Sequence, residues 1–229
     1  HGPYSHTWDR VVYSKIYNVE KGHDQHRLYI LEHVYGEILK EINVDLDDVM
    51  NIWNGYDEIG SGLVQGPLGS DRMDFIKRDV NYTGTQHFGI IDIYRVLRNT
   101  VIEYKDGREY LCYKSKIFPD IVQGLSSRDY MYSQVYNHRT SVSAEILLHL
   151  MIENSTCDFI EQTKDLRKFL DLTDESIVYQ VLYTDESELA KKYARAYLDR
   201  RLPKMVEEKK VYVEDIEHCP GIFQSGEYV

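Results

Sequence analysis

Histidine and aspartate side chains are concentrated at the start of this 229-residue sequence. Nine histidines are present, and five of them fall at positions 1, 6, 23, 26 and 33, with Asp9 and Asp24 among them. Imidazole titrates near neutral pH, and both residue types bind metal ions, so this cluster can serve acid–base catalysis or metal binding. Each histidine taken singly also fits a surface or capping role, and His33 and His149 are expected to be structural.

A second group of candidate residues follows helical spacing. Asp71, Phe75 and Asp79 stand at i, i+4 and i+8, so a helix would place two carboxylates and a ring on one face, with Arg72 beside them. The alternative is a solvated charged face with Phe75 in the core. A similar face is expected on a helix over 126–154, made of Arg128, Tyr132, Tyr136 and Arg139.

Three segments, in order, resemble the motifs of HD-domain phosphohydrolases. The run from His1 to Asp9 (HGPYSHTWD) resembles the second half of H-D-x-G-H-G-P-F-S-H. The segment 71–84 resembles the D-R/K-x-D-Y-x-x-R-D…G helix, and the segment 128–139 resembles R-N-x-x-H…Y-Q-H-K. Together with the hairpin and the segment 172–204, they resemble the dNTP triphosphohydrolases that pair a sterile-alpha-motif with an HD domain, over nearly the whole chain to about Glu207.

The resemblance implies catalytic roles for residues near the start of the chain. His6 matches the histidine that protonates the leaving 5′ oxygen, and Asp9 and His23 match residues that support it. Asp71 matches the last ligand of a divalent metal ion (Fe, Mn, Mg or Zn). The other metal ligands belong upstream of His1, so we expect most of the metal site, and the activity, to depend on residues outside 1–229.

The resemblance also implies a substrate site for a dNTP. Positions that match contacts to the triphosphate are His1, Arg72 and Arg128. Phe75 stands where the family has tyrosine, so ring stacking is expected without a hydroxyl contact. Asp79 and Asn137 match groups near the sugar 3′-OH, although glutamine is usual at the second position. Tyr136 matches the ring that packs where a ribose 2′-OH would lie.

A set of basic residues matches the positions that hold an activating nucleotide between subunits in that branch. They are Arg95, Lys114, Lys116, Arg200 and Lys204. The resemblance implies a guanine-nucleotide activator and a homo-oligomer, either a dimer or a tetramer. Without it, these side chains read as ordinary solvated surface residues.

The elements that must position these residues are mostly helical. Apolar spacing and capping signals predict helices over 25–42, 45–53, 71–82, 90–99, 126–154, 174–183 and 185–198. The last helix would start with Asp185 as N-cap and Glu188 three residues later. The stretch 54–69 holds five glycines and a proline, which favours loops with brief helical pieces. Two β-rich runs around Asp106-Gly107 predict a hairpin over 100–113 with a mirror-image turn.

These elements predict a mostly α HD-domain helical bundle with a small hairpin, a short strand after Lys209 and an irregular C-terminal tail. No change in composition marks a boundary, so one N-terminally incomplete domain over 1–229 is expected. Its parts would be catalytic helices and hairpin (1–154) and a C-terminal helical lobe with the tail (155–229). Three widely spaced cysteines, Cys112, Cys157 and Cys219, favour neither a disulfide framework nor a cysteine zinc site.

The composition and net charge limit the kinds of partner that the protein is expected to bind. The net charge is −11 and the isoelectric point about 5.3, which argues against duplex nucleic acid as a main partner. No apolar run approaches the roughly 18–20 residues that span a bilayer. The sequence starts with histidine and shows no signal peptide, so we expect part of a longer intracellular protein, cytoplasmic or nuclear.

The function expected from the resemblance is metal-dependent hydrolysis of dNTPs to deoxynucleoside and triphosphate. The alternatives are an HD phosphohydrolase that acts on another nucleotide, and a non-catalytic, nucleotide-binding regulatory HD protein.

Overall fold

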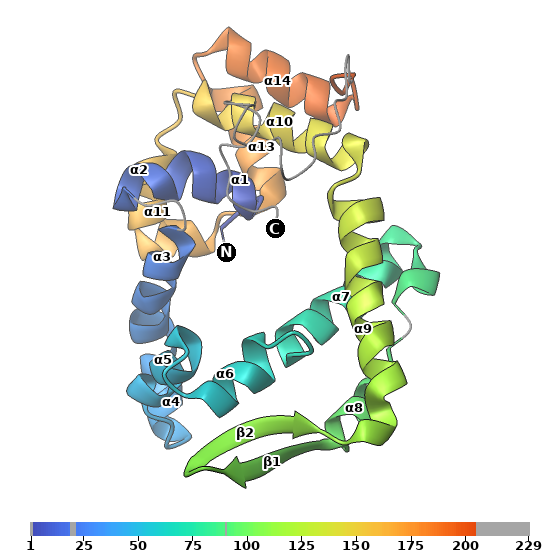
Figure 1. The fold of residues 1–229 in the computed structure, drawn as a ribbon. Helices are drawn as coiled ribbons and strands as arrows, with labels where there is room; N and C mark the ends of the chain where they lie inside the picture. The colour runs from blue at the N-terminus through green and yellow to red at the C-terminus, as the bar shows by residue number, and fades with distance from the viewer. Residues whose placement is uncertain (1, 19–21, 90, 205–229) are drawn as a thin grey trace, which may run out of the picture.

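Residues 2–18, 22–89 and 91–204 are described by the computed structural model, and they form a mainly helical fold with one β-hairpin (Figure 1). The predicted mostly α bundle with a small hairpin is confirmed. The C-terminal tail, its predicted strand and Cys219 lie outside the described residues, as does His1. Within the described ranges, no helix is both long enough and apolar enough to cross a bilayer.

The chain opens with a helical segment that the sequence did not predict. It comprises α1 (His6–Trp8), a π-helical turn η1 (Asp9–Tyr13) and α2 (Ser14–Tyr17), and it ends at Asn18, whose φ of 55° is left-handed. The predicted helix 25–42 is present and starts earlier. It runs as α3 (Gly22–Ile30), the π-turn η2 (Leu31–Tyr35) and α4 (Gly36–Glu41).

Aspartate caps define the next helices. In α5 (Leu46–Asn54), the Asp45 carboxylate accepts from the N–H of Asp47, as expected of an N-cap. In α6 (Glu58–Gln65), Asp57 caps in the same way, so the stretch 54–69 contains a two-turn helix rather than only brief helical pieces. The predicted helix 71–82 is α7 (Ser70–Thr83), which ends at Gly84 in a left-handed conformation.

The hairpin is confirmed in both strands and turn. Strand β1 (Thr100–Lys105) pairs antiparallel with β2 (Arg108–Tyr113). Asp106 and Gly107 have φ values of 52° and 77°, as a mirror-image turn requires. The helix predicted over 90–99 is shorter, since α8 (Ile93–Leu97) begins only after its N-cap Asp92. Short 3₁₀ turns flank this region: η3 (Gln86–Phe88) and η4 (Ser115–Ile117).

The single helix predicted over 126–154 is wrong. Helix α9 (Phe118–Met131) starts earlier, with a proline in its first turn, and continues as the π-turn η5 (Tyr132–Tyr136). The path breaks at His138, whose extended backbone and side chain cap α10 (Arg139–Glu153) by accepting from the N–H of Thr140. Arg139 therefore begins a new helix. Val142 and Ile146, two apolar residues of α10, are exposed.

The C-terminal helices correct one more prediction. The sequence did not predict two of these helices, α11 (Phe159–Lys164) and α12 (Leu166–Leu170). Helix α13 (Asp174–Thr184) matches the helix predicted over 174–183. Helix α14 (Glu188–Leu198) is capped by Ser187, not by Asp185. The Asp185 carboxylate is instead buried and accepts hydrogen bonds from Ser155, Thr156 and the N–H of Ser187. Burial alone would raise the pKa of Asp185, but these hydrogen bonds hold it well below its usual range.

The main core joins the two ends of the described chain. Trp8 and its neighbours on η1 pack with buried residues of α10–α14, and the Trp8 indole donates to Thr163 Oγ1 at 3.2 Å. Figure 1 accordingly shows the blue N-terminal helices beside the orange C-terminal ones. This core draws residues from both sides of position 154, while the single-domain assignment stays a prediction. Helix α7 packs through two smaller cores, around Met73 and around Ile76.

Candidate active site

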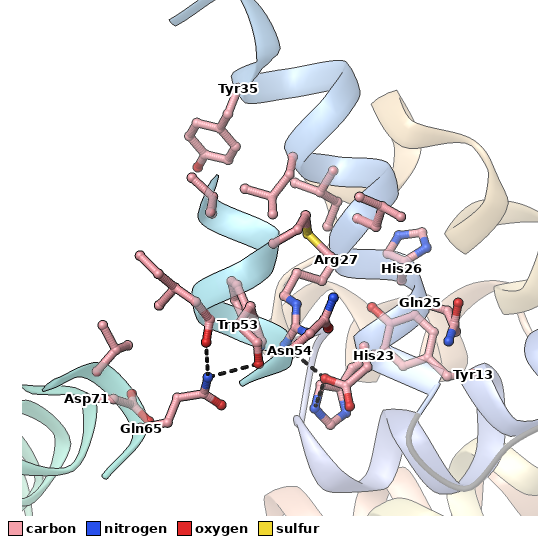
Figure 2. A pocket seen from close by; sticks show the side chains of 18 residues that line it. Tyr13, His23, Gln25, His26, Arg27, Tyr35, Trp53, Asn54, Gln65 and Asp71 are labelled. Carbon is pink, nitrogen blue, oxygen red and sulfur yellow. Dashed lines mark hydrogen bonds and ion pairs between the residues drawn. The ribbon is translucent and has the colours of Figure 1, made fainter. Parts of the chain in front are cut away.

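A cavity of about 1150 Å³ lies between α3 with η2 on one side and α5, α6 and the start of α7 on the other. The polar side chains that line it include His23, Asp24 and Arg27 from α3 and Gln65 and Asp71 from the facing wall. The apolar side chains that line it include Leu28, Leu31, Tyr35, Val49 and Ile52. In Figure 2, Asp71 and Gln65 stand on one side of the cavity and His23 on the other.

His23 is held from behind by Asp9. One carboxylate oxygen of Asp9 accepts the backbone N–H of His23 at 2.9 Å, and the other is hydrogen-bonded to the ring nitrogen Nδ1. Asp9 is only 5% exposed, so this contact is shielded from water. A carboxylate on Nδ1 fixes the tautomer and directs the other nitrogen, Nε2, outward. The resemblance had grouped these two residues, and the structure brings them together.

Asp24 and Arg27 extend this network along α3. The Asp24 carboxylate lies 3.4 Å from His23 Nε2 and accepts from Arg27 at 2.8 Å. The Arg27 guanidinium stacks 3.2 Å above the Trp53 ring, and burial lowers its pKa while Asp24 opposes that shift. Sequence reasoning missed Arg27 and Trp53. The acid–base spacing of Asp24 and Arg27 on a helix could have indicated the ion pair, but not the stacking.

Asp71, the expected metal ligand, is an exposed carboxylate in the first turn of α7, and it lines the cavity. A protein metal site usually has three or more ligands. Among residues 2–18, 22–89 and 91–204, no group of three or more His, Cys, Asp or Glu side chains is arranged to hold a metal ion. To hold a metal ion, Asp71 would need further ligands beside it.

Arg72, an expected triphosphate contact, is turned toward the end of α6. Its guanidinium donates to the backbone carbonyls of Gln65, the last residue of α6, and of its C-cap Gly66, which accept no N–H from within the helix. In this conformation Arg72 holds the α6–α7 connection. A phosphate contact from Arg72 would require these hydrogen bonds to be exchanged.

A second group of predicted residues comes together between α7 and η5. The Tyr136 hydroxyl donates to Asp79 Oδ2 at 2.6 Å, across 57 residues of sequence. The Phe75 ring meets the Tyr136 ring edge-on, with centroids 6.2 Å apart. Burial and the neighbouring Asp79 carboxylate raise the pKa of Tyr136, so the hydroxyl keeps its proton. These side chains do not line the cavity of His23; Asp79 follows Asp71 by about 12 Å along α7.

The remaining predicted residues lie around these two groups. Arg128 lies with its guanidinium 5.4 Å from the centre of the Tyr132 ring, and Asn137 follows Tyr136 at the end of η5. His6 is exposed on α1, one turn before Asp9. His1 is outside the described residues.

The five predicted activator contacts fall into two places. Arg95, Lys114 and Lys116 lie near α8 and β2, while Arg200 and Lys204 follow α14 at the opposite end of the structure (Figure 1). Arg95 pairs with Asp120 at 2.8 Å. One copy of the chain does not bring the two sets together, so a shared ligand would have to lie between copies.

Comparison with known proteins identifies the fold. No protein-family model matches the chain. A phosphohydrolase from Bacteroides thetaiotaomicron has a similar structure, with a TM-score of 0.68 over 95% of this chain and 58% of that chain, at 23% sequence identity. The chain therefore shares the fold of that phosphohydrolase, a mostly helical bundle with one hairpin that is consistent with an HD domain. The mostly helical bundle implied by the three motifs is thus confirmed at the level of fold.

Several curated proteins are similar to the chain in sequence, and one of them has an HD domain in its name. An HD domain-containing protein of Acanthamoeba polyphaga mimivirus is 26% identical over 188 residues, which are 77% of this chain and 40% of the relative. An uncharacterized protein of Methanocaldococcus jannaschii is 26% identical over 205 residues, 88% of this chain and 39% of the relative. The chain spans about two fifths of the length of the curated relatives that it matches.

Proposed function

We propose that the protein to which this chain belongs hydrolyses dNTPs to deoxynucleoside and triphosphate. One observation carries the proposal: His23, oriented by buried Asp9, and the motif-matched Asp71 line the same cavity from facing walls. An oriented imidazole opposite a carboxylate suits proton transfer beside a bound phosphate. The HD phosphohydrolase fold supports the reaction class, and the motif resemblance supports the dNTP.

The proposed roles follow from the hydrogen bonds. Asp9 holds the His23 imidazole in one tautomer and would stabilise it when protonated. A water molecule would attack the α-phosphorus and add its oxygen to the triphosphate, while His6, one turn before Asp9, would protonate the 5′ oxygen as its bond to the α-phosphorus breaks, which releases the deoxynucleoside. The triphosphate would then leave as one unit. Arg128, and Arg72 after release from its backbone partners, would neutralise charge on the phosphates.

The residues that come together between α7 and η5 would bind the sugar. Asp79, already fixed by the Tyr136 hydroxyl, retains lone pairs that can accept from a 3′-OH, and Asn137 would assist. The Tyr136 ring would fill the space of a 2′-OH, so ribonucleotides would bind poorly. Phe75 would pack on the sugar or the ring of Tyr136.

A divalent cation would supply Lewis-acid chemistry at the phosphates if Asp71 is joined by ligands outside the described residues. Its identity, Fe, Mn, Mg or Zn, would follow from those ligands.

We also propose a guanine-nucleotide activator at Arg95, Lys114, Lys116, Arg200 and Lys204. Because the two sets of residues lie at opposite ends of the structure (Figure 1), such a site would require a homo-oligomer, either a dimer or a tetramer.

Product analysis tests the proposal. The whole protein is incubated with each dNTP and a series of divalent metals, and the products are separated by chromatography. Deoxynucleoside and triphosphate are expected, with His23→Asn inactive. His33→Asn is the matched control, because His33 is an exposed histidine on the same helical path. Pyrophosphate or monophosphate products would instead support another nucleotide reaction. Nucleotide binding with no product under any metal would support the regulatory alternative.

A further inference from the structure

His26 is a buried histidine that the proposed mechanism does not use. Its side chain is 2% exposed and is surrounded by aromatic rings, with Phe169 at 4.5 Å and Tyr13 at 5.2 Å between centroids. Burial lowers its pKa from 6.5 to about 4, so the ring is neutral at pH 7. The nitrogen Nε2 is buried and lacks a hydrogen-bond partner among the described residues.

A phenylalanine would fill this apolar site without burying an unpaired nitrogen, so the histidine is an unfavourable choice for stability alone. What distinguishes it from a phenylalanine is Nδ1. This nitrogen is hydrogen-bonded to the Tyr17 hydroxyl at 2.7 Å. Tyr17 is the last residue of α2, and His26 lies in the second turn of α3, so the hydrogen bond joins the two helices across their connection.

The same junction sets the position of His23. The backbone of Gly22 lies so close to η1 that an added Cβ would clash with Cβ of Tyr13. One residue later, His23 reaches Asp9 through its backbone N–H and its ring. His26 follows His23 by three residues, on the neighbouring position of the same helix. Any shift or rotation of α3 against η1 would move His23 away from Asp9.

We propose that Tyr17 and His26 are positioning residues that hold the start of α3 so that His23 keeps its contact with Asp9 and directs Nε2 into the cavity. The inference rests on the proposed function, because the value of that orientation lies in the catalytic role of His23. In this proposal, the hydrogen bond between His26 and Tyr17 holds the start of α3 in place, and the packing of the His26 ring does not.

Two substitutions at one position separate the bond from the packing. His26→Phe keeps a ring in the aromatic site and removes the nitrogen that is hydrogen-bonded to Tyr17. His26→Asn removes the ring and keeps an amide near the position of Nδ1, which can accept from the Tyr17 hydroxyl or donate to it. Tyr17→Phe removes the same hydrogen bond from the other side. His33→Phe is the matched control, since it changes an exposed histidine on the same helical path.

Three readouts are taken on the whole protein: thermal stability, the ¹⁵N NMR signals of the His23 ring, and the kcat and KM of dNTP hydrolysis. His26→Phe and Tyr17→Phe are expected to alter the His23 signals and to lower kcat about two- to tenfold, the equivalent of one net hydrogen bond, with KM nearly unchanged. His26→Asn should unfold at a lower temperature yet keep the His23 signals and most of kcat. The control should change none of the three.

The opposite pattern overturns the inference. If kcat follows stability, His26→Asn loses activity while His26→Phe and Tyr17→Phe keep it. In that case His26 is only a packing residue. Unchanged His23 signals in both His26→Phe and Tyr17→Phe would likewise overturn the inference. The NMR readout also separates this inference from the proposed function: a wild-type protein that hydrolyses no dNTP refutes the function, while the His23 signals still decide the positioning.

Discussion

The hydrogen bond between Tyr136 and Asp79 offers a direct test of the sugar site. Tyr136→Phe removes one oxygen, which donates to Asp79 Oδ2 at 2.6 Å, and leaves the ring in place. A hydrogen bond to a charged group contributes about 1.5–3 kcal/mol, and both side chains here are only partly buried, so we expect about 1–2 kcal/mol. That loss corresponds to a roughly 5- to 30-fold fall in kcat/KM.

The fall should be specific in two ways. An Asp79 carboxylate freed from Tyr136 can rotate away from the 3′-OH, so most of the change should appear for the preferred dNTP. The phenyl ring that the substitution leaves in place would still exclude a 2′-OH, so the ribonucleotide should remain a poor substrate. Steady-state kinetics with dGTP and GTP on the whole protein measure both effects, and urea unfolding should show about 1 kcal/mol of lost stability.

Tyr130→Phe is the matched control, because Tyr130 is a half-exposed tyrosine on α9 whose ring packs against Phe88 instead. It should leave kcat/KM within about twofold of the wild type. Equal falls in the two variants would refute the assignment of Tyr136. So would a Tyr136→Phe variant with unchanged kcat/KM, or a wild-type protein that turns over dGTP and GTP equally well.

Three further outcomes follow from the structure. Gly22→Ala should destabilise the protein by about 1–3 kcal/mol through overpacking, whereas Gly36→Ala, where a Cβ meets nothing closer than 3.9 Å, should be neutral or stabilising in urea unfolding. Because the pKa of His26 is lowered from 6.5 to about 4, the unfolded state binds more protons than the folded state between these two values. The free energy of unfolding should therefore fall by about 2 kcal/mol from about pH 7 to about pH 5, and His26→Phe should remove that part of the fall. Adding dGTP should shift the protein to a larger oligomer in sedimentation, and Arg200→Ala with Lys204→Ala should abolish the shift; an unchanged profile at saturating dGTP contradicts the activator site.

Local signals in the sequence were sufficient for elements that are defined by their own residues. Asp45 caps α5 and Gly84 ends α7, and the two residues of the hairpin turn adopt the positive φ values that their types favour. Each of these features depends on a side chain and the backbone within a few positions of it. They could therefore be predicted without any knowledge of the tertiary structure.

Other features depended on contacts that the sequence does not display. Asp185 has the spacing of an N-cap, yet its carboxylate is buried against Ser155 and Thr156, some thirty residues earlier. His138 interrupts a continuous apolar pattern because its own side chain caps a new helix. In both cases a polar side chain had two sets of partners available, and tertiary packing selected between them.

The candidate site shows the same division. The family resemblance placed Asp9 with His23 and Asp79 with Tyr136, because a resemblance carries tertiary information that spacing does not. It did not place Arg27 on Trp53, since it implied no role for either residue.

Apolar periodicity has its own limit, and the helix from α3 to α4 makes it visible. The spacing of Leu31, Tyr35, Ile38 and Ile42 predicted a helix correctly, yet Ile38 and Ile42 are 50% and 60% exposed among the described residues. Periodicity specifies which side of a helix is apolar, because side chains at i and i+4 project together. Whether that side is buried depends on which other part of a protein packs against it. The same argument applies to His26, where the sequence offered a histidine near two others and only the surrounding rings revealed that it is neutral, buried and hydrogen-bonded to Tyr17.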